Sequence, residues 1–408
     1  MASSTVAAAT VRPDAAVAEQ EGAGRNLALA TFAFTVCFFA WSLIGPLSPE
    51  LQKQLALSDV ETSAMVAVPV LLGSIMRVPL GLFADLFGAR RVFTALMAFS
   101  ILPTAALAIW HDSLTSIVAL GLLLGVAGAS FAVGVVHVNG WYGPRRRGFA
   151  LGVYGMGMGG TVIAAVSAPR ISDARGLAAP FWLATGLLVL ATVVFAALAR
   201  DAAPPAPRTG PVRMLAPLTV FRSSARAWAL TLFYFVAFGG FVAMFLYLPK
   251  LLTGVHDLSK TDAGGRAAGF ALLAVIARPV GGWLADRIPP QRVLRVSFSA
   301  TAVLAVLLAF SYEQMVPLTI ECLLLAIFLG LGTGAVFKLV AHWFPGEVGA
   351  VTGVVGAAGG LGGFFPPLIM GIVKSATGSY TLGFLLMALV AVAALIVATR
   401  VTDPAATA

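Results

Sequence analysis

The sequence predicts an all-α membrane protein whose twelve transmembrane helices form two pseudo-symmetric bundles of six. Three observations lead to this prediction. Of the 408 residues, 59% are hydrophobic and only 11% are charged, whereas soluble domains contain about 25% charged residues. Twelve apolar stretches approach or exceed the length of about 20 residues that a span requires. The two halves also repeat one another, because Arg77, Gly81 and Asp85 recur as Arg278, Gly282 and Asp286, each 201 residues later.

The twelve predicted spans are regularly spaced and separated by short polar segments. Several of them are rich in glycine, as is common where membrane helices pack closely. An N-terminal bundle is expected over residues 27–199 and a C-terminal bundle over residues 227–401. The predicted spans are residues 27–46, 63–86, 92–110, 115–138, 148–168, 180–199, 227–249, 267–285, 296–312, 316–341, 348–373 and 380–399.

Polar segments flank and divide the two bundles. The longest, residues 200–226, contains five prolines and five arginines and separates six spans from six, so it is predicted to be a cytoplasmic linker. Residues 1–26 are rich in alanine and lack the apolar core of a signal peptide. They are expected to form a disordered cytoplasmic tail, and residues 402–408 a second short tail.

The net charge of +9 is spread along the chain between the spans. It does not form a single patch, which argues against a nucleic-acid partner. With the N-terminus placed inside, most of the Lys and Arg residues outside the spans fall on the cytoplasmic side, as the positive-inside rule requires. We therefore expect a monomeric, multi-pass protein embedded in the lipid of the cell's inner (cytoplasmic) membrane, with both termini cytoplasmic.

Nothing in the sequence indicates an enzyme, a metal or a cofactor. Cys37 and Cys322 both fall inside predicted spans and are expected to be buried free thiols, without metal-ligand spacing. A catalytic site would need a nucleophile, a base or a set of metal ligands. The four histidines lie at span ends or in loops, without paired acids or cysteines: His111, His137, His256 and His342.

Two arginines lie deep within predicted spans. Arg77 is eight residues from Asp85, or about 12 Å along a helix, in a hydrocarbon core whose half-thickness is about 15 Å. Arg278 has the same position relative to Asp286. A charge at this depth costs a few kcal/mol or more and normally faces a polar cavity or a partner. Because the spans contain almost no acids, we predict a shared site for a small planar anion, which a guanidinium binds with paired donors.

A repeated loop motif follows each of the two arginine-containing spans. It resembles the cytoplasmic loop motif of the major facilitator superfamily. An acid at this position can accept charge-assisted hydrogen bonds from helix N-termini or arginines, which predicts a latch that holds the two halves in one state. The first copy contains Gly81, Asp85, Gly88, Arg90 and Arg91, and the second contains Gly282, Asp286 and Arg287, with Pro289 in place of the last glycine.

Glycine-rich stretches occupy the fifth span, residues 152–160, and the eleventh span, residues 353–363. Such stretches let helix backbones touch and leave main-chain groups open to a small ligand. Together with the two arginines and the segment from Gly334 to Lys338, they resemble the nitrate/nitrite porter family of the major facilitator superfamily over essentially all twelve spans. The resemblance implies an alternating-access transporter that moves nitrate and/or nitrite. Such a carrier would suit nitrate assimilation or respiration.

The resemblance also implies a set of site residues. In that family two arginines clamp the anion and aromatic side chains wall it above and below. Met158 departs from the family pattern, because an Asn is usual at this position; either its hydrogen bond is lost or another donor such as Thr161 replaces it. The implied substrate-binding residues are Arg77, Arg278, Phe131, Tyr234, Phe238, Gly157, Gly159, Gly359 and Gly360.

The sequence says less about whether transport is driven by protons or by exchange of anions. His137 and Lys338 lie 201 residues apart, near the predicted cytoplasmic ends of the fourth and tenth spans. They would form an electropositive vestibule, or His137 would take part in coupling to protons, since histidine titrates near neutral pH. The scarcity of buried carboxylates favours exchange of one anion for another. In that scheme the two arginines repel each other in the empty carrier until an anion neutralises them.

Other functions fit the sequence to different degrees. A facilitator for another small anion, such as cyanate or a short carboxylate, would also suit two arginines. A drug exporter usually places carboxylates in its pocket to meet cations, and none is evident here. A fixed channel fits duplicated halves joined by a basic linker less well than two bundles that rock about a central site.

Overall fold

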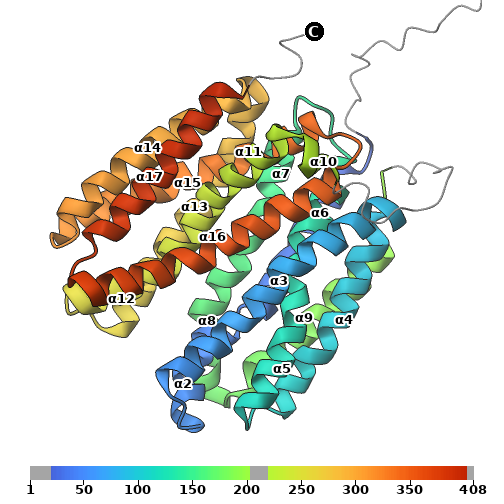
Figure 1. Ribbon diagram of the computed structural model, residues 1–408. Coiled ribbons are helices and arrows are strands. Elements are labelled where there is room, and N and C mark those ends of the chain that lie inside the picture. The colour runs from blue at the N-terminus through green and yellow to red at the C-terminus, as the bar shows by residue number, and fades with distance from the viewer. Residues whose placement is uncertain (1–19, 203–218, 402–408) are drawn as a thin grey trace, which may run out of the picture.

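The computed structural model describes residues 20–202 and 219–401, and within these ranges every regular element is a helix (Figure 1). Twelve helical segments in this part of the chain are long and apolar enough to cross a membrane. The protein is therefore a multi-pass membrane protein of the predicted fold class. Most of the predicted N-terminal tail, the middle of the linker and the C-terminal tail lie outside the described residues.

The N-terminal half contains six spans, and three of them are built from more than one helical piece. The first combines α1 (Ala23–Trp41) and α2 (Ile44–Gln54), and the next two are α3 (Asp59–Phe87) and α4 (Ala89–Ile109). The fourth joins α5 (Leu114–Leu124) to α6 (Ser130–Asn139) through a 3₁₀ turn, η1 (Gly125–Ala129). The fifth joins α7 (Arg147–Gly155) to α8 (Gly160–Arg175) through a second 3₁₀ turn, η2 (Met156–Gly159), and the sixth is α9 (Ala178–Leu198).

The C-terminal half repeats this plan with longer unbroken helices. A short helix, α10 (Val220–Ser223), precedes it within the predicted linker. The seventh span joins α11 (Ala225–Tyr234) to α12 (Gly240–Val255) through a π-helical turn, η4 (Phe235–Gly239). The remaining spans are α13 (Lys260–Arg287), α14 (Pro290–Ser311), α15 (Met315–Trp343), α16 (Val348–Thr377) and α17 (Thr381–Arg400).

Each predicted span overlaps a helix, but several helices are longer than predicted. Helix α1 begins at Ala23, inside the predicted tail, and α11 begins at Ala225, inside the predicted linker. Lys53 and Lys250, which lie outside the predicted spans, are on α2 and α12. Hydropathy marks only the part of a helix that lies in hydrocarbon. The backbone hydrogen bonds continue beyond it, where basic side chains can extend to the headgroups.

Local sequence signals determine several helix ends. Ser58 and Glu61 form a reciprocal capping box at the start of α3. Gly88 separates α3 from α4 with φ 90°, a backbone conformation that favours glycine. The corresponding turn in the C-terminal half is made by Pro289, with Pro290 in the first turn of α14. The two copies of the loop motif therefore form the same connection by different backbone chemistry.

The two halves meet along two helix pairs, in which α3 packs on α16 and α7 packs on α13 (Figure 1). Glycines permit the close approach. A Cβ atom on Gly81 or Gly349 would overlap the carbonyl oxygen of the other, and the same holds for Gly148 and Gly282. The repeated glycines of the sequence therefore lie at the boundary between the bundles, as expected where small residues let membrane helices touch.

The same close packing within the C-terminal half predicts a stability difference between two glycines. A Cβ on Gly281 of α13 would overlap the carbonyl oxygen of Leu331, whereas Gly186 of α9 has nothing within 4 Å of that position. Gly281→Ala should lower the free energy of unfolding by about 1–3 kcal/mol through overpacking. Gly186→Ala should be neutral or stabilising by up to about 1 kcal/mol, since alanine favours helix. Thermal unfolding of both variants in detergent, followed by tryptophan fluorescence, tests this; equal melting temperatures would contradict it.

Candidate functional site

The two predicted arginines are buried at the boundary between the halves. Arg77 on α3 and Arg278 on α13 are each 3% exposed. Arg77 donates from Nε to the carbonyl oxygen of Gly128 in its own half (3.2 Å) and from Nη1 to that of Gly356 in the other half (2.5 Å). The irregular backbone of η1 exposes the first of these acceptors. Arg77 therefore bridges the two bundles through main-chain oxygens.

Arg278 contacts side chains in both halves. Its Nη1 donates to the sulfur of Met158 in the N-terminal half, and its Nη2 lies 3.4 Å from the hydroxyl oxygen of Tyr234. Its Nε is buried without a hydrogen-bond partner in the described part of the chain. Arg278 is thus less completely hydrogen-bonded than Arg77.

Neither arginine forms an ion pair with a carboxylate among the described residues. Burying a charge without an opposite charge is costly, and hydrogen bonds to neutral acceptors compensate only in part. The two guanidiniums are therefore an electropositive pair with donor capacity for an anion.

Three predicted aromatic residues surround the arginines. The rings of Phe131 and Tyr234 are nearly parallel (7°, centroids 6.0 Å apart), as are those of Tyr234 and Phe238 (4°, 4.9 Å). The Phe238 ring centroid is 5.6 Å from Cζ of Arg77 and 5.8 Å from Cζ of Arg278, and Phe131 is 5.5 Å from the latter. These are cation–π distances. The five residues form one group, called the central cluster below: Arg77, Arg278, Phe131, Tyr234 and Phe238.

Irregular helical turns occur where the chain passes the central cluster. The turn η1 supplies the Gly128 carbonyl, η2 contains Met158 and η4 contains Phe238. Mid-helix 3₁₀ and π turns are frequent at functional sites, and irregular backbone at membrane depth is tolerated where it is buried in protein or lines a cavity. All three turns thus combine irregular backbone with buried residues next to the two arginines.

Two of the four predicted glycines lie beside the central cluster and two do not. Gly359 faces the rings of Tyr234 and Phe238, and Gly360 lies next to Arg77. By contrast, Gly157 packs on the Phe34 ring within its own half, and the position of a Cβ on Gly159 has only Val275 nearby.

Other residues adjoin the cluster that were not predicted to do so. Gly155 lies against the Arg278 guanidinium and Gly356 against the Arg77 side chain. They are 201 residues apart, so the repeat could have identified them. Phe337 packs edge-on against Phe131 and Tyr234, at 4.8 and 4.7 Å. Tyr154 stacks on Phe131 at 6.0 Å and donates to a main-chain oxygen; neither ring has a repeat signal.

The acids of the two loop motifs bond to the opposite half. The carboxylate of Asp85 accepts from the backbone N–H groups of Gly349 (3.1 Å) and Ala350 (3.0 Å), at the start of α16. The carboxylate of Asp286 accepts from those of Gly148 and Phe149 (both 2.8 Å), at the start of α7. A carboxylate at a helix N-terminus satisfies free N–H groups and interacts favourably with the helix dipole. We refer to these as the two carboxylate contacts.

Lys338 reinforces the second carboxylate contact. Its Nζ lies 2.5 Å from Oδ1 of Asp286 and donates to the carbonyl oxygen of Pro144 in the other half. The equivalent residue, His137, has different partners. His137 is buried in its own half, with Nδ1 3.7 Å from Oδ1 of Asp201 and its ring 5.4 Å from Phe195. The two residues predicted to form a vestibule or to take part in coupling are thus each held by a separate carboxylate.

The arginines of the loop motif bind locally. The backbone N–H of Arg90 donates to Asp201 (3.0 Å) and its guanidinium to the carbonyl oxygen of Ala196 (2.5 Å), all in the N-terminal half. Burial alone would raise the pKa of Asp201, but the adjacent His137 and Arg90, which donates its backbone N–H, outweigh burial and lower the pKa below its usual value. Arg287 stacks on Trp283 at 3.9 Å, and Arg91 is exposed.

A family model and solved structures define the class of protein. The family model described as "Major Facilitator Superfamily" matches residues 30–337 and 256–408. The fold is similar to that of the human organic anion transporter MFSD10, with a TM-score of 0.78, 16% identity and coverage of 93% of this chain and 100% of that chain. It is also similar to the transporter FucP in its outward conformation, with a TM-score of 0.75, 17% identity and coverage of 92% and 99%. The protein is a membrane transporter of this class.

Curated relatives narrow the class to a family. The chain is 43% identical over 380 residues to a probable nitrate/nitrite transporter, NarK2, of Mycobacterium tuberculosis, covering 91% of this chain and 95% of the relative. It is 36% identical to the nitrite extrusion protein of Bacillus subtilis (91% and 92% covered) and 37% identical to a probable nitrate transporter, NarT, of Staphylococcus haemolyticus (91% and 95%). The chain belongs to the nitrate/nitrite porter family, as the sequence resemblance predicted, and this is a family of transporters, not enzymes.

The carboxylate contacts hold the two halves together at the end where these contacts lie, so removal of one carboxylate charge should make the halves separate more readily there. Asp286→Asn keeps one acceptor but loses the charge, which should weaken the contact by about 1 kcal/mol, or roughly fivefold in the opening equilibrium. Ala150, buried in the first turns of α7, is replaced by cysteine as a reporter, with Cys37 and Cys322 replaced by alanine. Maleimide labelling should be about fivefold faster in the Asp286→Asn background.

Asp262 provides a matched control, since it lies at the opposite end of the same helix, where it accepts from Ser259. Asp262→Asn should leave labelling at Ala150→Cys unchanged. Equal labelling rates in all three backgrounds would show that the Asp286 contact does not hold the halves together.

Proposed function

We propose that this protein is an alternating-access transporter that moves nitrate and/or nitrite across the cytoplasmic membrane, with the anion clamped between Arg77 and Arg278. One observation carries the proposal. Two buried guanidiniums, contributed by equivalent positions of the two halves, lie within cation–π distance of the same Phe238 ring, with no carboxylate partner in the described part of the chain. A small anion supplies the missing negative charge.

The shape and chemistry of the central cluster support a planar monoanion. The parallel rings of Phe131, Tyr234 and Phe238 present flat faces, and each guanidinium offers coplanar donors that match two oxygens at once. Nitrate and nitrite are planar and singly charged, and the relatives named above carry nitrate or nitrite in their names. Cyanate or a short carboxylate is the alternative cargo; an excess of unlabelled cyanate or acetate in the uptake assay below would then suppress labelled nitrate uptake more strongly than the same excess of unlabelled nitrate.

The carboxylate contacts support the alternating-access part of the proposal. They join the halves at the end where α3 ends and α16 begins and where α13 ends and α7 begins. The positive-inside rule places this end in the cytoplasm, because Arg145, Arg146 and Arg147 lie here. In the proposed cycle the two contacts close the cytoplasmic side. Their rupture allows the bundles to rock about the bound anion.

Exchange of anions is the proposed mode of coupling. The residues of the central cluster include no carboxylate and no histidine, and His137 is held by Asp201 away from it. Without an anion, the two arginines would have to pass through the conformational change as unneutralised like charges in a low-dielectric environment, which is unfavourable. A bound anion removes that barrier, so the loaded carrier reorients faster than the empty one.

Conservative substitution of either arginine tests the clamp. Arg77→Lys or Arg278→Lys keeps the charge but loses the planar fork, and each lost charge-assisted hydrogen bond is worth about 1.5–3 kcal/mol. Uptake of labelled nitrate into proteoliposomes should fall about 10- to 100-fold. Arg295→Lys, at an exposed position on α14, should transport normally. Wild-type uptake by either clamp variant at equal protein content would exclude the clamp.

Proteoliposomes of defined content test exchange. Vesicles loaded with nitrite or nitrate should take up labelled nitrate, because an internal anion carries the loaded site back. Vesicles with no internal permeant anion should show little uptake, even with an inward proton gradient, since the empty carrier reorients slowly. Accumulation of nitrate driven by the proton gradient alone would show that protons are the coupling ion.

A further inference from the structure

We infer that Met158 is an internal ligand of Arg278 which the anion displaces on binding, and that it biases the site toward the more weakly hydrated of two anions. This inference rests on the proposed function of the central cluster. It assigns a role to the residue at which the sequence departs from the family pattern, and it predicts which of the two proposed substrates the site prefers.

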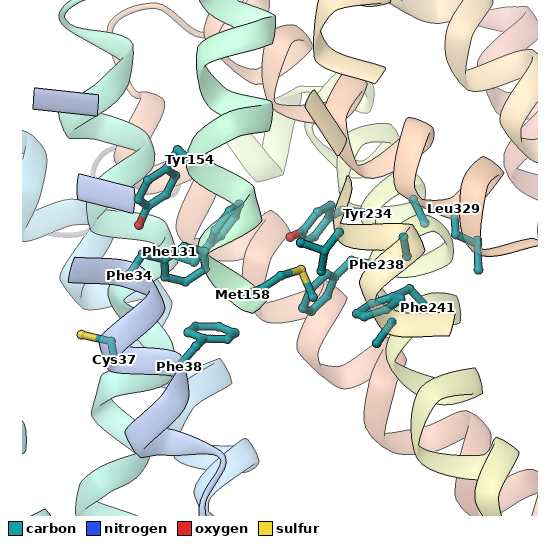
Figure 2. Close-up of a cluster of buried hydrophobic side chains, with 14 of the residues drawn as sticks. Phe34, Cys37, Phe38, Phe131, Tyr154, Met158, Tyr234, Phe238, Phe241 and Leu329 are labelled. Atoms are coloured by element: carbon teal, nitrogen blue, oxygen red, sulfur yellow. The ribbon is translucent and has the colours of Figure 1, made fainter. Parts of the chain in front are cut away.

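The first argument is positional. Met158 is 3% exposed and lies in the 3₁₀ turn η2 of the N-terminal half, yet its sulfur accepts from Nη1 of Arg278 in the C-terminal half. Figure 2 shows the Met158 side chain extending between Phe131 and the pair Tyr234 and Phe238. Its sulfur therefore occupies one of the donor directions that a clamped anion would use.

The second argument concerns the strength of this contact. A thioether sulfur is a weak hydrogen-bond acceptor, whereas a main-chain carbonyl oxygen is a strong one. Arg77 is bonded to two carbonyl oxygens, but Arg278 has the Met158 sulfur, a Tyr234 oxygen at 3.4 Å and a buried Nε without a partner. An anion therefore gains more at Arg278 than at Arg77, and displacing the sulfur is the least costly step.

The third argument concerns selectivity. A methionine has no N–H or O–H to offer, and the neighbouring Thr161 hydroxyl already donates to the Met158 carbonyl oxygen at 2.8 Å. At this place an anion loses hydration and finds an apolar side chain that offers it no donor. An anion that gives up strong hydration without new donors loses more. Nitrate spreads its charge over three oxygens and is more weakly hydrated than nitrite, so the site should prefer nitrate.

Two substitutions separate the two parts of the inference. Met158→Leu removes the acceptor but remains apolar, and Met158→Gln places an amide donor at the same reach. Met156, half-buried in the same turn, gives the matched control Met156→Leu. The KM and Vmax for nitrate and for nitrite are measured by exchange in proteoliposomes of the full chain. Size-exclusion profiles and melting temperatures in detergent show that each variant is folded.

Met158→Leu should lower the KM for nitrate about 2- to 10-fold, the range expected for loss of one competing hydrogen bond, with the nitrite/nitrate KM ratio unchanged. Met158→Gln should lower that ratio by a similar factor, and Met156→Leu should alter neither. An unchanged or raised nitrate KM in Met158→Leu overturns the internal-ligand role, and an unchanged ratio in Met158→Gln overturns the selectivity role. If Met158→Gln does not fold, Met158→Asn, which carries the same amide on a shorter side chain, takes its place in the test of the ratio. Failure of the wild-type protein to exchange either anion would instead overturn the proposed function.

Discussion

The structure depends on the burial of two like charges at the boundary between two bundles. Arg77 and Arg278 lie in a water-poor interior without a carboxylate partner among the described residues. Main-chain oxygens, a sulfur, a tyrosine hydroxyl and aromatic faces compensate the two charges only in part. Each of these groups is weaker than an opposite charge, so the pair retains uncompensated positive charge, which is the basis of the proposed anion site. A carboxylate at this place would compensate that charge more simply and would leave nothing for an anion to neutralise.

The helices of the two halves pack backbone to backbone, and this close packing lets residues of both halves contact the two arginines. Three glycines occur at matching positions along α7 and along α16. On each helix the first glycine lies against a carboxylate contact, the second against the main chain of an arginine and the third against the side chain of that arginine. A Cβ atom at most of these glycines would overlap backbone or the guanidinium. Larger residues would therefore separate the halves and lengthen the contacts of the central cluster. The glycines concerned are Gly148, Gly152 and Gly155 on α7 and Gly349, Gly353 and Gly356 on α16.

Sequence reasoning found the parts of the site that follow the duplication and missed the parts that break it. Arg77 and Arg278 were visible because the repeat preserves both. The aromatic residues are not duplicated: the position 201 residues after Phe131 is Gly332, and only the family resemblance identified Phe131. Phe337 had no such signal. The irregular turns were not predicted either, because their amino-acid composition does not distinguish a 3₁₀ or π turn from regular α-helix. Side-chain direction, such as the sulfur of Met158 on Arg278, depends on tertiary packing that periodicity does not encode.

The same contrast between symmetric backbone and asymmetric side chains holds at the carboxylate contacts. Asp85 and Asp286 accept hydrogen bonds from helix N-termini in the same way. Lys338 and His137 also occupy equivalent positions of the two halves, but they bind different partners. Lys338 extends to Asp286 and across to Pro144, whereas His137 turns to Asp201 at the start of the linker. One contact is therefore supported by a lysine that contacts both halves, whereas the equivalent histidine is held within one half. The Asp286 contact thus crosses the boundary twice, through the carboxylate at the start of α7 and through Lys338 at the carbonyl oxygen of Pro144.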